Sequence, residues 1–317
     1  MKRSSVAMAY AAIVAVVFIW GVIPAFKKAL IGGLFSAAVY TAMTTLSGAL
    51  VLLFLCRKQL KGLNATYFKI AIPTGLAVAA ASLVQAIAYN FDASPTKQAF
   101  LENLSCIVVP VLMLILVKKK PSALTVAAAL VCLASSFVLC DILSTGLSFG
   151  AADILNALAG VFYGVNIAFT GVYAKKLTAK LYVMIQLFVQ AFSSALMAVL
   201  FHFVPIGGSQ IDPFVFTPKL GPILILVCVG MVTNAVCWTL RTSAMKFVSP
   251  SVVAVIMPFS AVITSIVSVI LGMDRISRAL VGGAVLGLVA ALLSSFGDLK
   301  ESKAASASVE KEQKCKQ

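Results

Sequence analysis

Apolar runs of about 20 residues follow one another along almost the whole chain, and charged residues rarely interrupt them. A helix of that length crosses the hydrocarbon core of a bilayer, whereas a water-soluble core has no place for so many of them. The runs occupy residues 6–26, 36–56, 70–89, 96–117, 124–140, 153–172, 181–203, 222–240, 251–272 and 279–296. These ten runs predict an all-α polytopic membrane protein with ten transmembrane helices, whose main partner is the lipid bilayer.

The basic residues predict the orientation of these helices. Hydrophobic residues make up 61% of the chain, more than in soluble domains, so the net charge of +15 does not indicate a nucleic-acid partner. If the N-terminus is cytoplasmic, 19 of the 25 lysines and arginines lie on the cytoplasmic side, Arg241 among them, and six lie outside, Lys27 among them. The positive-inside rule then predicts that both termini are cytoplasmic and that the number of spans is even.

Two constant offsets relate the two halves of the chain. Ser94-Pro95 aligns with Ser249-Pro250 at an offset of 155 residues, and Trp20-Gly21 aligns with Tyr163-Gly164 at an offset of 143. Because five spans are an odd number, the second copy is inserted upside down relative to the first. We therefore predict an inverted repeat of five helices at residues 1–146 and 147–298, followed by a disordered cytoplasmic tail at 299–317.

Glu102 is an acidic side chain set well inside an apolar run. Gln98 lies one helical turn before it and Cys106 one turn after it, so one face of the run is polar. A carboxylate buried in a bilayer is expensive unless it is protonated, paired or facing a water-filled cavity. Lys97, the nearest basic residue in sequence, lies well around the helix, so no partner is expected there. Two interpretations stay open: a protonated carboxyl that bonds a neighbouring helix, or a site for a cationic substrate group or a coupled proton.

Aromatic and amide side chains supply further candidates for a binding site. Tyr163 and Asn166 share one face of the sixth run, Asn234 and Trp238 lie one turn apart in the eighth, and Trp20 lies on the matching face of the first. Such side chains either join helices by hydrogen bonds or form the wall of a cavity.

Two prolines interrupt otherwise regular apolar runs. Pro110 in the fourth run and Pro258 in the ninth each remove a backbone donor and leave a carbonyl without its helical partner. We predict that both positions bend their helices.

The fourth and ninth runs lie within the segments AYNFDASPTKQAFLENLSCIVVPVLMLILVKKKPS and AMKFVSPSVVAVIMPFSAVITSIVSVILGMDRIS. With these segments, the aromatic-glycine pairs and a five-span repeat, the chain resembles the EamA family of the drug/metabolite transporter superfamily, and Pro258 matches a proline of that family. The resemblance implies a secondary active transporter that exports or exchanges a small organic metabolite, such as an amino acid, by alternating access. It also implies a cavity lined by both halves and a location in the plasma membrane, the inner membrane of a bacterium or archaeon.

Within that cavity we expect the substrate to contact Glu102, Gln98, Tyr163, Asn166, Asn234, Trp238 and Trp20, and we expect Glu102 to carry any coupled proton. A membrane enzyme is less compatible with the sequence, since such enzymes need clustered acids, a Ser/His pair or a His-rich metal site. The ten acidic residues lie mostly in loops and the tail, and there is one histidine, so no metal or cofactor is expected. A channel or a sensor is the alternative, and small residues such as Gly283 and Gly287 permit packing in a monomer or a homodimer.

The predicted orientation is tested by labelling single cysteines with an impermeant thiol reagent in intact cells. Cysteines placed near Lys119 and Lys303 should be shielded, and a cysteine near Gly208 should be labelled, because the positive-inside rule assigns these positions to opposite sides. Labelling near Lys303 without labelling near Gly208 would contradict the topology.

Overall fold

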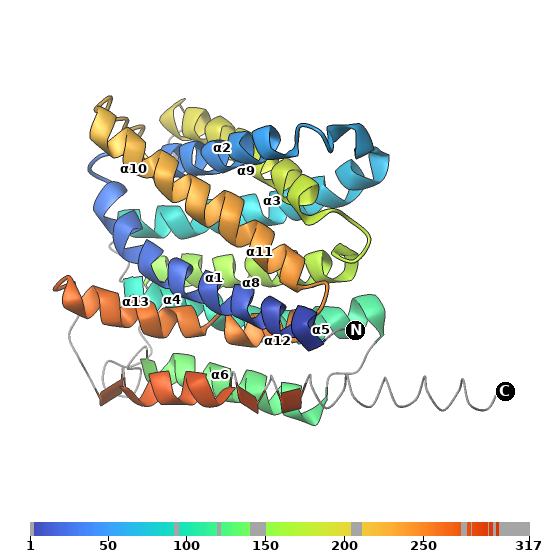
Figure 1. Cartoon of the computed structure of the whole chain (residues 1–317). Coiled ribbons are helices and arrows are strands. Elements are labelled where there is room, and N and C mark those ends of the chain that lie inside the picture. Colours follow the sequence, from blue (N-terminus) through green and yellow to red (C-terminus); the bar gives the residue numbers. More distant parts are fainter. Residues whose placement is uncertain are drawn as a thin grey trace.

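Helices form all the regular structure in the described part of the chain (Figure 1). The computed structural model describes residues 3–91, 95–118, 122–139, 150–203, 211–273, 278–279, 281–290, 292–293 and 296–297. The predicted tail, the side chain of Lys97 and the three positions chosen for labelling lie outside the described residues.

The first half of the chain contributes six α-helices, one of them continued by a 3₁₀ turn into the next. They are α1 (Arg3–Leu30), α2 (Ala37–Cys56), α3 (Ala65–Ile87), α4 (Pro95–Leu101), the turn Glu102–Leu104, α5 (Ser105–Val117) and α6 (Ala123–Leu139). Short 3₁₀ segments at Leu60–Gly62 and Ala88–Phe91 flank α3.

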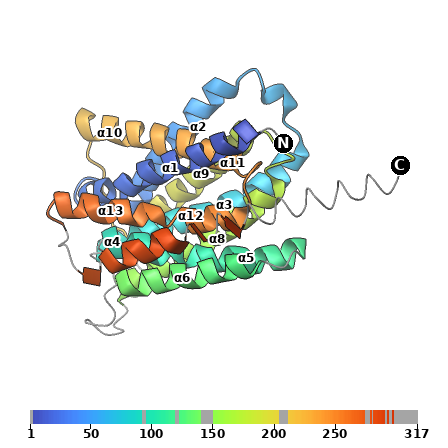
Figure 2. The same ribbon diagram turned by 60° about the horizontal axis from the view of Figure 1, so that its bottom comes forward.

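The second half is built in the same manner. It contains α8 (Ala151–Tyr173), α9 (Ala179–Phe203), α10 (Leu220–Gly230), a π-helical segment at Met231–Cys237, α11 (Trp238–Ala244), α12 (Pro250–Ile256) and α13 (Phe259–Ile270). A last apolar helix at Val281–Ala290 packs beside α6, where the Ser135 hydroxyl donates to the Gly283 carbonyl at 2.7 Å. Figure 2 shows this pair along one edge of the bundle.

Seven of the described helical stretches are long and apolar enough to cross a membrane. Three shorter apolar helices accompany them, at Glu102–Val117, Ala123–Val138 and Val281–Ala290. Large apolar side chains such as Phe54, Phe192 and Ile270 are exposed on the outside of the bundle, as expected for surfaces that face lipid. The prediction of an all-α polytopic membrane protein is confirmed in this form.

Helix interruptions coincide only partly with the predicted prolines. Pro258 lies at the junction between α12 and α13, where Met257 and Pro258 form a turn. Pro110, by contrast, lies within α5, which continues past it to Val117. The interruption of the fourth span is instead the 3₁₀ turn that begins at Glu102, eight residues before this proline.

Two glycines allow helices of opposite halves to touch. A Cβ atom on Gly21 of α1 would lie 2.6 Å from Ile263 of α13 and 2.9 Å from the Ser260 carbonyl oxygen. A Cβ atom on Gly164 of α8 would lie 2.7 Å from Val108 of α5. Both glycines are therefore required by close packing, and each belongs to an aromatic-glycine pair of the predicted repeat.

The positions of two basic residues change the interpretation of the charge pattern. Arg241 is 2% exposed and Lys27 is half-buried, and both line an internal cavity. The charge count treated both as loop residues, but Lys27 lies in α1 and Arg241 lies in α11. Without them the count is 18 cytoplasmic against five outside, so the predicted orientation of the termini still follows from the remaining residues.

Asp212 ties the loop before α10 to the first half of the chain. Its two carboxylate oxygens accept the backbone N–H groups of Ala37 and Ala38 at the start of α2, each at 2.8 Å. The Asn90 side chain, just after α3, donates to the same carboxylate at 2.9 Å. A carboxylate in this position satisfies free helical donors and complements the helix dipole.

Replacing either tight glycine by alanine should destabilise the bundle. Gly21→Ala and Gly164→Ala each place a methyl group against a β-branched side chain, so each should lower the free energy of unfolding by about 1–3 kcal/mol. Gly62→Ala is the matched control, because a Cβ atom there meets no atom within 4 Å. Thermal unfolding of the detergent-solubilised protein measures the difference; equal midpoints for all three variants would contradict this account of the packing.

Candidate functional site

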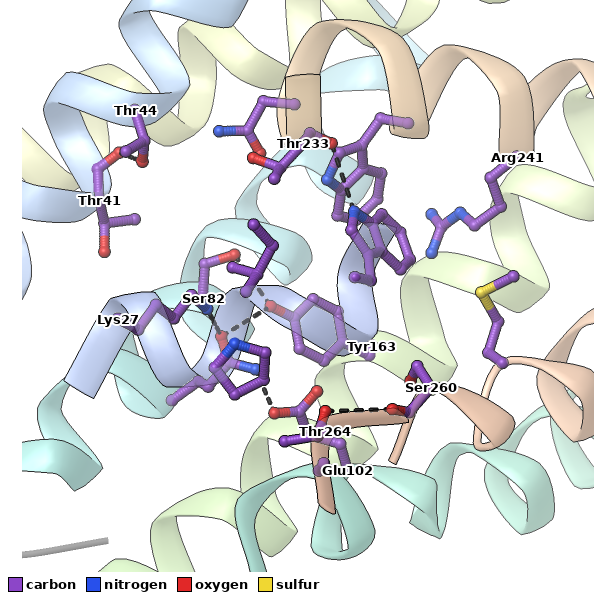
Figure 3. Close-up of a pocket in the computed structure, with 18 of the residues that line it drawn as sticks. Lys27, Thr41, Thr44, Ser82, Glu102, Tyr163, Thr233, Arg241, Ser260 and Thr264 are labelled. Atoms are coloured by element: carbon purple, nitrogen blue, oxygen red, sulfur yellow. Dashed lines mark hydrogen bonds between the residues drawn. The ribbon is translucent and has the colours of Figure 1, made fainter. Parts of the chain in front are cut away.

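A cavity of about 150 Å³ lies where helices of both halves converge (Figure 3). Five of the seven predicted substrate residues line it: Trp20, Glu102, Tyr163, Asn234 and Trp238. Gln98 and Asn166 lie behind the lining and hold two charged residues that face the cavity. The structure thus brings all seven predicted residues into one region.

Glu102 occupies its position because the fourth span is interrupted there. The residue begins the 3₁₀ turn between α4 and α5, and this turn packs against Gly160 of α8. A Cβ atom on Gly160 would lie 2.9 Å from the Glu102 carbonyl oxygen, so only glycine allows the backbones to come this close. The backbone contact holds the base of the Glu102 side chain at the cavity wall.

The Glu102 carboxylate is the centre of a polar cluster made by Lys27, Gln85, Gln98 and Glu102. Gln98 donates from Nε2 to Glu102 Oε1 at 2.9 Å, and Gln85 Nε2 donates to the same oxygen. Lys27 Nζ donates to Gln85 Oε1, so the glutamine amide links the cation to the carboxylate. The opposite charges of Lys27 and Glu102 attract each other across this bridge.

This cluster gives the acid a cationic neighbour that the sequence analysis did not find. The cation comes from α1, 75 residues away in sequence, rather than from the helix of Glu102 itself. Helical spacing reports neighbours on one helix only, and so it excluded Lys97 as a partner and could not find Lys27.

Three aromatic rings form the middle of the cavity. The ring centroids of Trp20 and Trp238 are 5.5 Å apart, and those of Tyr163 and Trp238 are 6.4 Å apart. The Tyr163 hydroxyl lies 3.2 Å from Ser82 Oγ and donates to Gln85 Oε1 at 3.5 Å, which joins the aromatic rings to the polar cluster. The Trp20 indole N–H donates to the Thr233 carbonyl at 3.4 Å, within the π-helical segment.

Arg241 is a second charged residue of the cavity, besides Lys27, that sequence reasoning missed. Its Nη2 donates to Asn166 Oδ1 at 2.7 Å, and its guanidinium carbon lies 4.0 Å from the Trp238 ring centre and 5.5 Å from that of Trp20. Contacts of this kind stabilise a desolvated guanidinium by about 2 kcal/mol. A sequence signal existed, because Asn234, Trp238 and Arg241 are spaced four and three residues apart and so lie on one helical face.

A buried network supports Asn166 from behind. Its Nδ2 donates to the Thr74 carbonyl at 3.1 Å, beside Pro73, which is inside α3. The Thr74 hydroxyl accepts from Tyr182 at 2.8 Å and from Gln186 at 2.9 Å. Since these bonds come from α3, α8 and α9, they fix the orientation of Asn166 and, through it, of Arg241.

Comparison with known proteins agrees with this arrangement. Residues 152–296 match the model of the EamA-like transporter family. Over this range the chain is similar to the EamA-like transporter family. The resemblance seen in the sequence is confirmed over this range, which begins at the start of α8 and contains Tyr163, Trp238 and Arg241.

The fold of nearly the whole chain is shared with a solved structure. That structure, titled only "Crystal structure of protein", superposes with a TM-score of 0.72 at 17% sequence identity, and the match covers 95% of this chain and 99% of that one. At this identity the likeness shows a shared fold alone. No curated protein sequence matches the chain. Among the described residues, no group of three or more His, Cys, Asp or Glu side chains is placed to hold a metal ion.

Lys27 and Glu102 should be energetically coupled. Lys27→Met leaves the Glu102 carboxylate without its cation and Glu102→Gln leaves the Lys27 ammonium without its anion, both inside the helix bundle, so each should destabilise the protein. The double variant removes both charges and should be less destabilised than the sum of the two, by about 0.5–3 kcal/mol. Thermal unfolding measures the cycle, with exposed Lys58→Met as the control in place of Lys27→Met. Additive effects would show that the two charges do not interact.

Proposed function

We propose that this EamA-family membrane protein is a secondary transporter that moves a small organic metabolite across the plasma membrane by alternating access. The observation that carries the proposal is the cavity between the two halves, lined by charged, amide and aromatic groups within an otherwise apolar bundle. Charged groups are expensive inside a bilayer and lie where a substrate or ion passes. The matched family is a family of transporters, which agrees with this function.

An inverted repeat of five helices, the architecture of alternating-access carriers, is supported by reciprocal packing. The offset of 143 relates Gly21 to Gly164, and the offset of 155 relates Val108 to Ile263. These are the residues that meet: Gly21 touches Ile263, and Gly164 touches Val108. In the same way α4 packs on α13 while α5 packs on α12. A pseudo-twofold relation between the halves requires such exchanged pairs.

The interruptions of the fourth and ninth spans also correspond. The offset of 155 relates Glu102, which directly follows α4, to Met257, which directly follows α12, and both residues line the cavity. Interrupted helices at the interface of two repeats have free backbone groups and form natural points of bending. We infer that these two spans change shape as the cavity opens to one side and then to the other.

Glu102 is proposed to carry a coupled proton. In the structure its carboxylate is compensated by Lys27 through Gln85. Protonation would remove the attraction that holds the lysine, so proton binding and the position of α1 are linked through this cluster. The cation of a substrate is the competing partner for the same carboxylate.

Transport is tested in two steps. Untargeted metabolomics of cells with and without the protein identifies compounds whose distribution changes, and counterflow in vesicles containing the purified protein then tests each of them. A carrier should show saturable counterflow that depends on substrate on the opposite side. Ion conductance without counterflow would identify a channel, and chemical conversion of the compound would identify an enzyme.

The role of Glu102 is tested by measuring counterflow in the same vesicles at several pH values. Glu102→Gln keeps the size of the side chain and replaces the carboxyl by an amide that does not titrate. The protein should therefore fold, and the pH dependence of counterflow should disappear. Gln98→Glu is the opposite case, because it keeps the size of the side chain and adds a second titratable carboxyl beside that of Glu102. Wild-type rates and wild-type pH dependence in the Glu102→Gln variant would assign this residue to structure alone.

A further inference from the structure

The cavity has two charged regions of different kind. Lys27 and Glu102 lie in the polar cluster, near the ends of α1 and α3 at Leu30 and Ile87, whereas Arg241 lies near the opposite end of the bundle, three residues from the end of α11. Figure 3 shows Lys27 and Arg241 on opposite sides of the cavity, with Tyr163 between them. A substrate in the cavity therefore meets the arginine at one end only.

The charges of the cavity do not cancel. Of the described residues that line it, Lys27, Glu102 and Arg241 carry a charge. Lys27 and Glu102 compensate each other through the Gln85 amide. Arg241 is held by a neutral amide and two neutral indole rings, so its positive charge is left without an anion. An uncompensated cation buried in a membrane protein strongly favours an incoming anion.

Hydrogen-bonding capacity at Arg241 is also unused. The guanidinium has five N–H donors in a planar fork, and Nη2 donates to Asn166. The buried Nε has no hydrogen-bond partner. The indole rings accept no hydrogen bond from the guanidinium, so its Nε donor is left for a ligand, and a carboxylate can accept two parallel hydrogen bonds from a guanidinium.

The remaining lining limits the rest of the ligand. The aromatic rings of Trp20, Trp238 and Tyr163 stand beside Arg241, and Ile23 and Ile167 add apolar surface. A cavity of about 150 Å³ is of the size that accommodates a benzene ring in other proteins. A small body that is planar or apolar is therefore favoured beside the anionic group.

We propose that Arg241 is the anion-binding residue of this cavity and that the ligand is a small carboxylate with a planar or apolar body, recognised by the guanidinium edge at one end and by the three rings beside it. This inference rests on the proposed transport function for its physiological meaning. It makes Asn166 a positioning residue, because Asn166 orients the arginine and does not itself line the cavity.

Binding can be measured without knowing the natural substrate. The chain contains two tryptophans, Trp20 and Trp238, and both line the cavity next to Arg241, so intrinsic tryptophan fluorescence reports on this site alone. The purified full-length protein in detergent is titrated with phenylacetate, with its neutral amide phenylacetamide and with the cation benzylamine. The three probes share the ring and differ in the charge of the attached group.

Phenylacetate should change the fluorescence saturably, and the amide and the amine should bind at least about thirtyfold more weakly, because they leave the buried guanidinium without an anion. Arg241→Gln should remove the preference for the carboxylate, and Arg241→Lys should retain part of it, since lysine keeps the charge but not the fork. Equal binding of the acid and its amide by the wild-type protein overturns the proposal, and so does the absence of a saturable response to phenylacetate. This comparison uses no variant and therefore stands even if an Arg241 variant fails to fold.

The result separates this inference from the proposed function. Carboxylate binding without counterflow of any metabolite would keep the anion site and overturn the transporter. Counterflow of a metabolite that carries no acid group, together with equal binding of the acid and the amide, would keep the transporter and overturn the role of Arg241.

Discussion

The bilayer's intolerance of unpaired charge is the constraint on which the arrangement of the helices depends. Lys27 and Glu102 come from α1 and from the α4–α5 turn, and Gln85 of α3 joins them. Arg241 of α11 is held by Asn166 of α8 and by two indoles. Each charged group is thus stabilised by side chains from other helices, and the helices that supply them surround one cavity. The polar residues therefore determine which helices are neighbours in the middle of the bundle, and the apolar ones make the surface that faces lipid.

Much of this fold could be predicted because its signals are local in sequence. The lengths of the apolar runs predicted the helices. The aromatic-glycine pairs predicted that Gly21 and Gly164 occupy equivalent positions in the two halves, and both glycines lie at close helix contacts. Glu102 stood out because an acid is rare in an apolar run. Lys27 and Arg241 did not, since a basic residue near a helix end reads equally well as an interfacial charge or as a cavity group. The distinction depends on neighbouring helices, which the sequence of one segment does not contain.

The positions of helix interruptions were also only partly predictable from the sequence. Pro258 marks the junction of α12 and α13, as the missing donor of a proline predicts. At the corresponding place in the first half there is no proline, and the helix changes to a 3₁₀ turn where its backbone packs on Gly160. Pro110 lies within α5. Tertiary packing can therefore interrupt a helix that composition alone would leave regular.

The π-helical segment at Met231–Cys237 has a consequence for how the cavity can change. A π turn holds an extra residue relative to an α turn, and here it directly precedes Trp238 and Arg241 on α11. Conversion of this segment to regular α geometry rotates the following helix by up to about 100°, the angle of one residue. Such a rotation carries the Trp238 ring and the arginine around the axis of α11 together. The guanidinium would leave the cavity by a change of helical register, with the helix axes keeping their places.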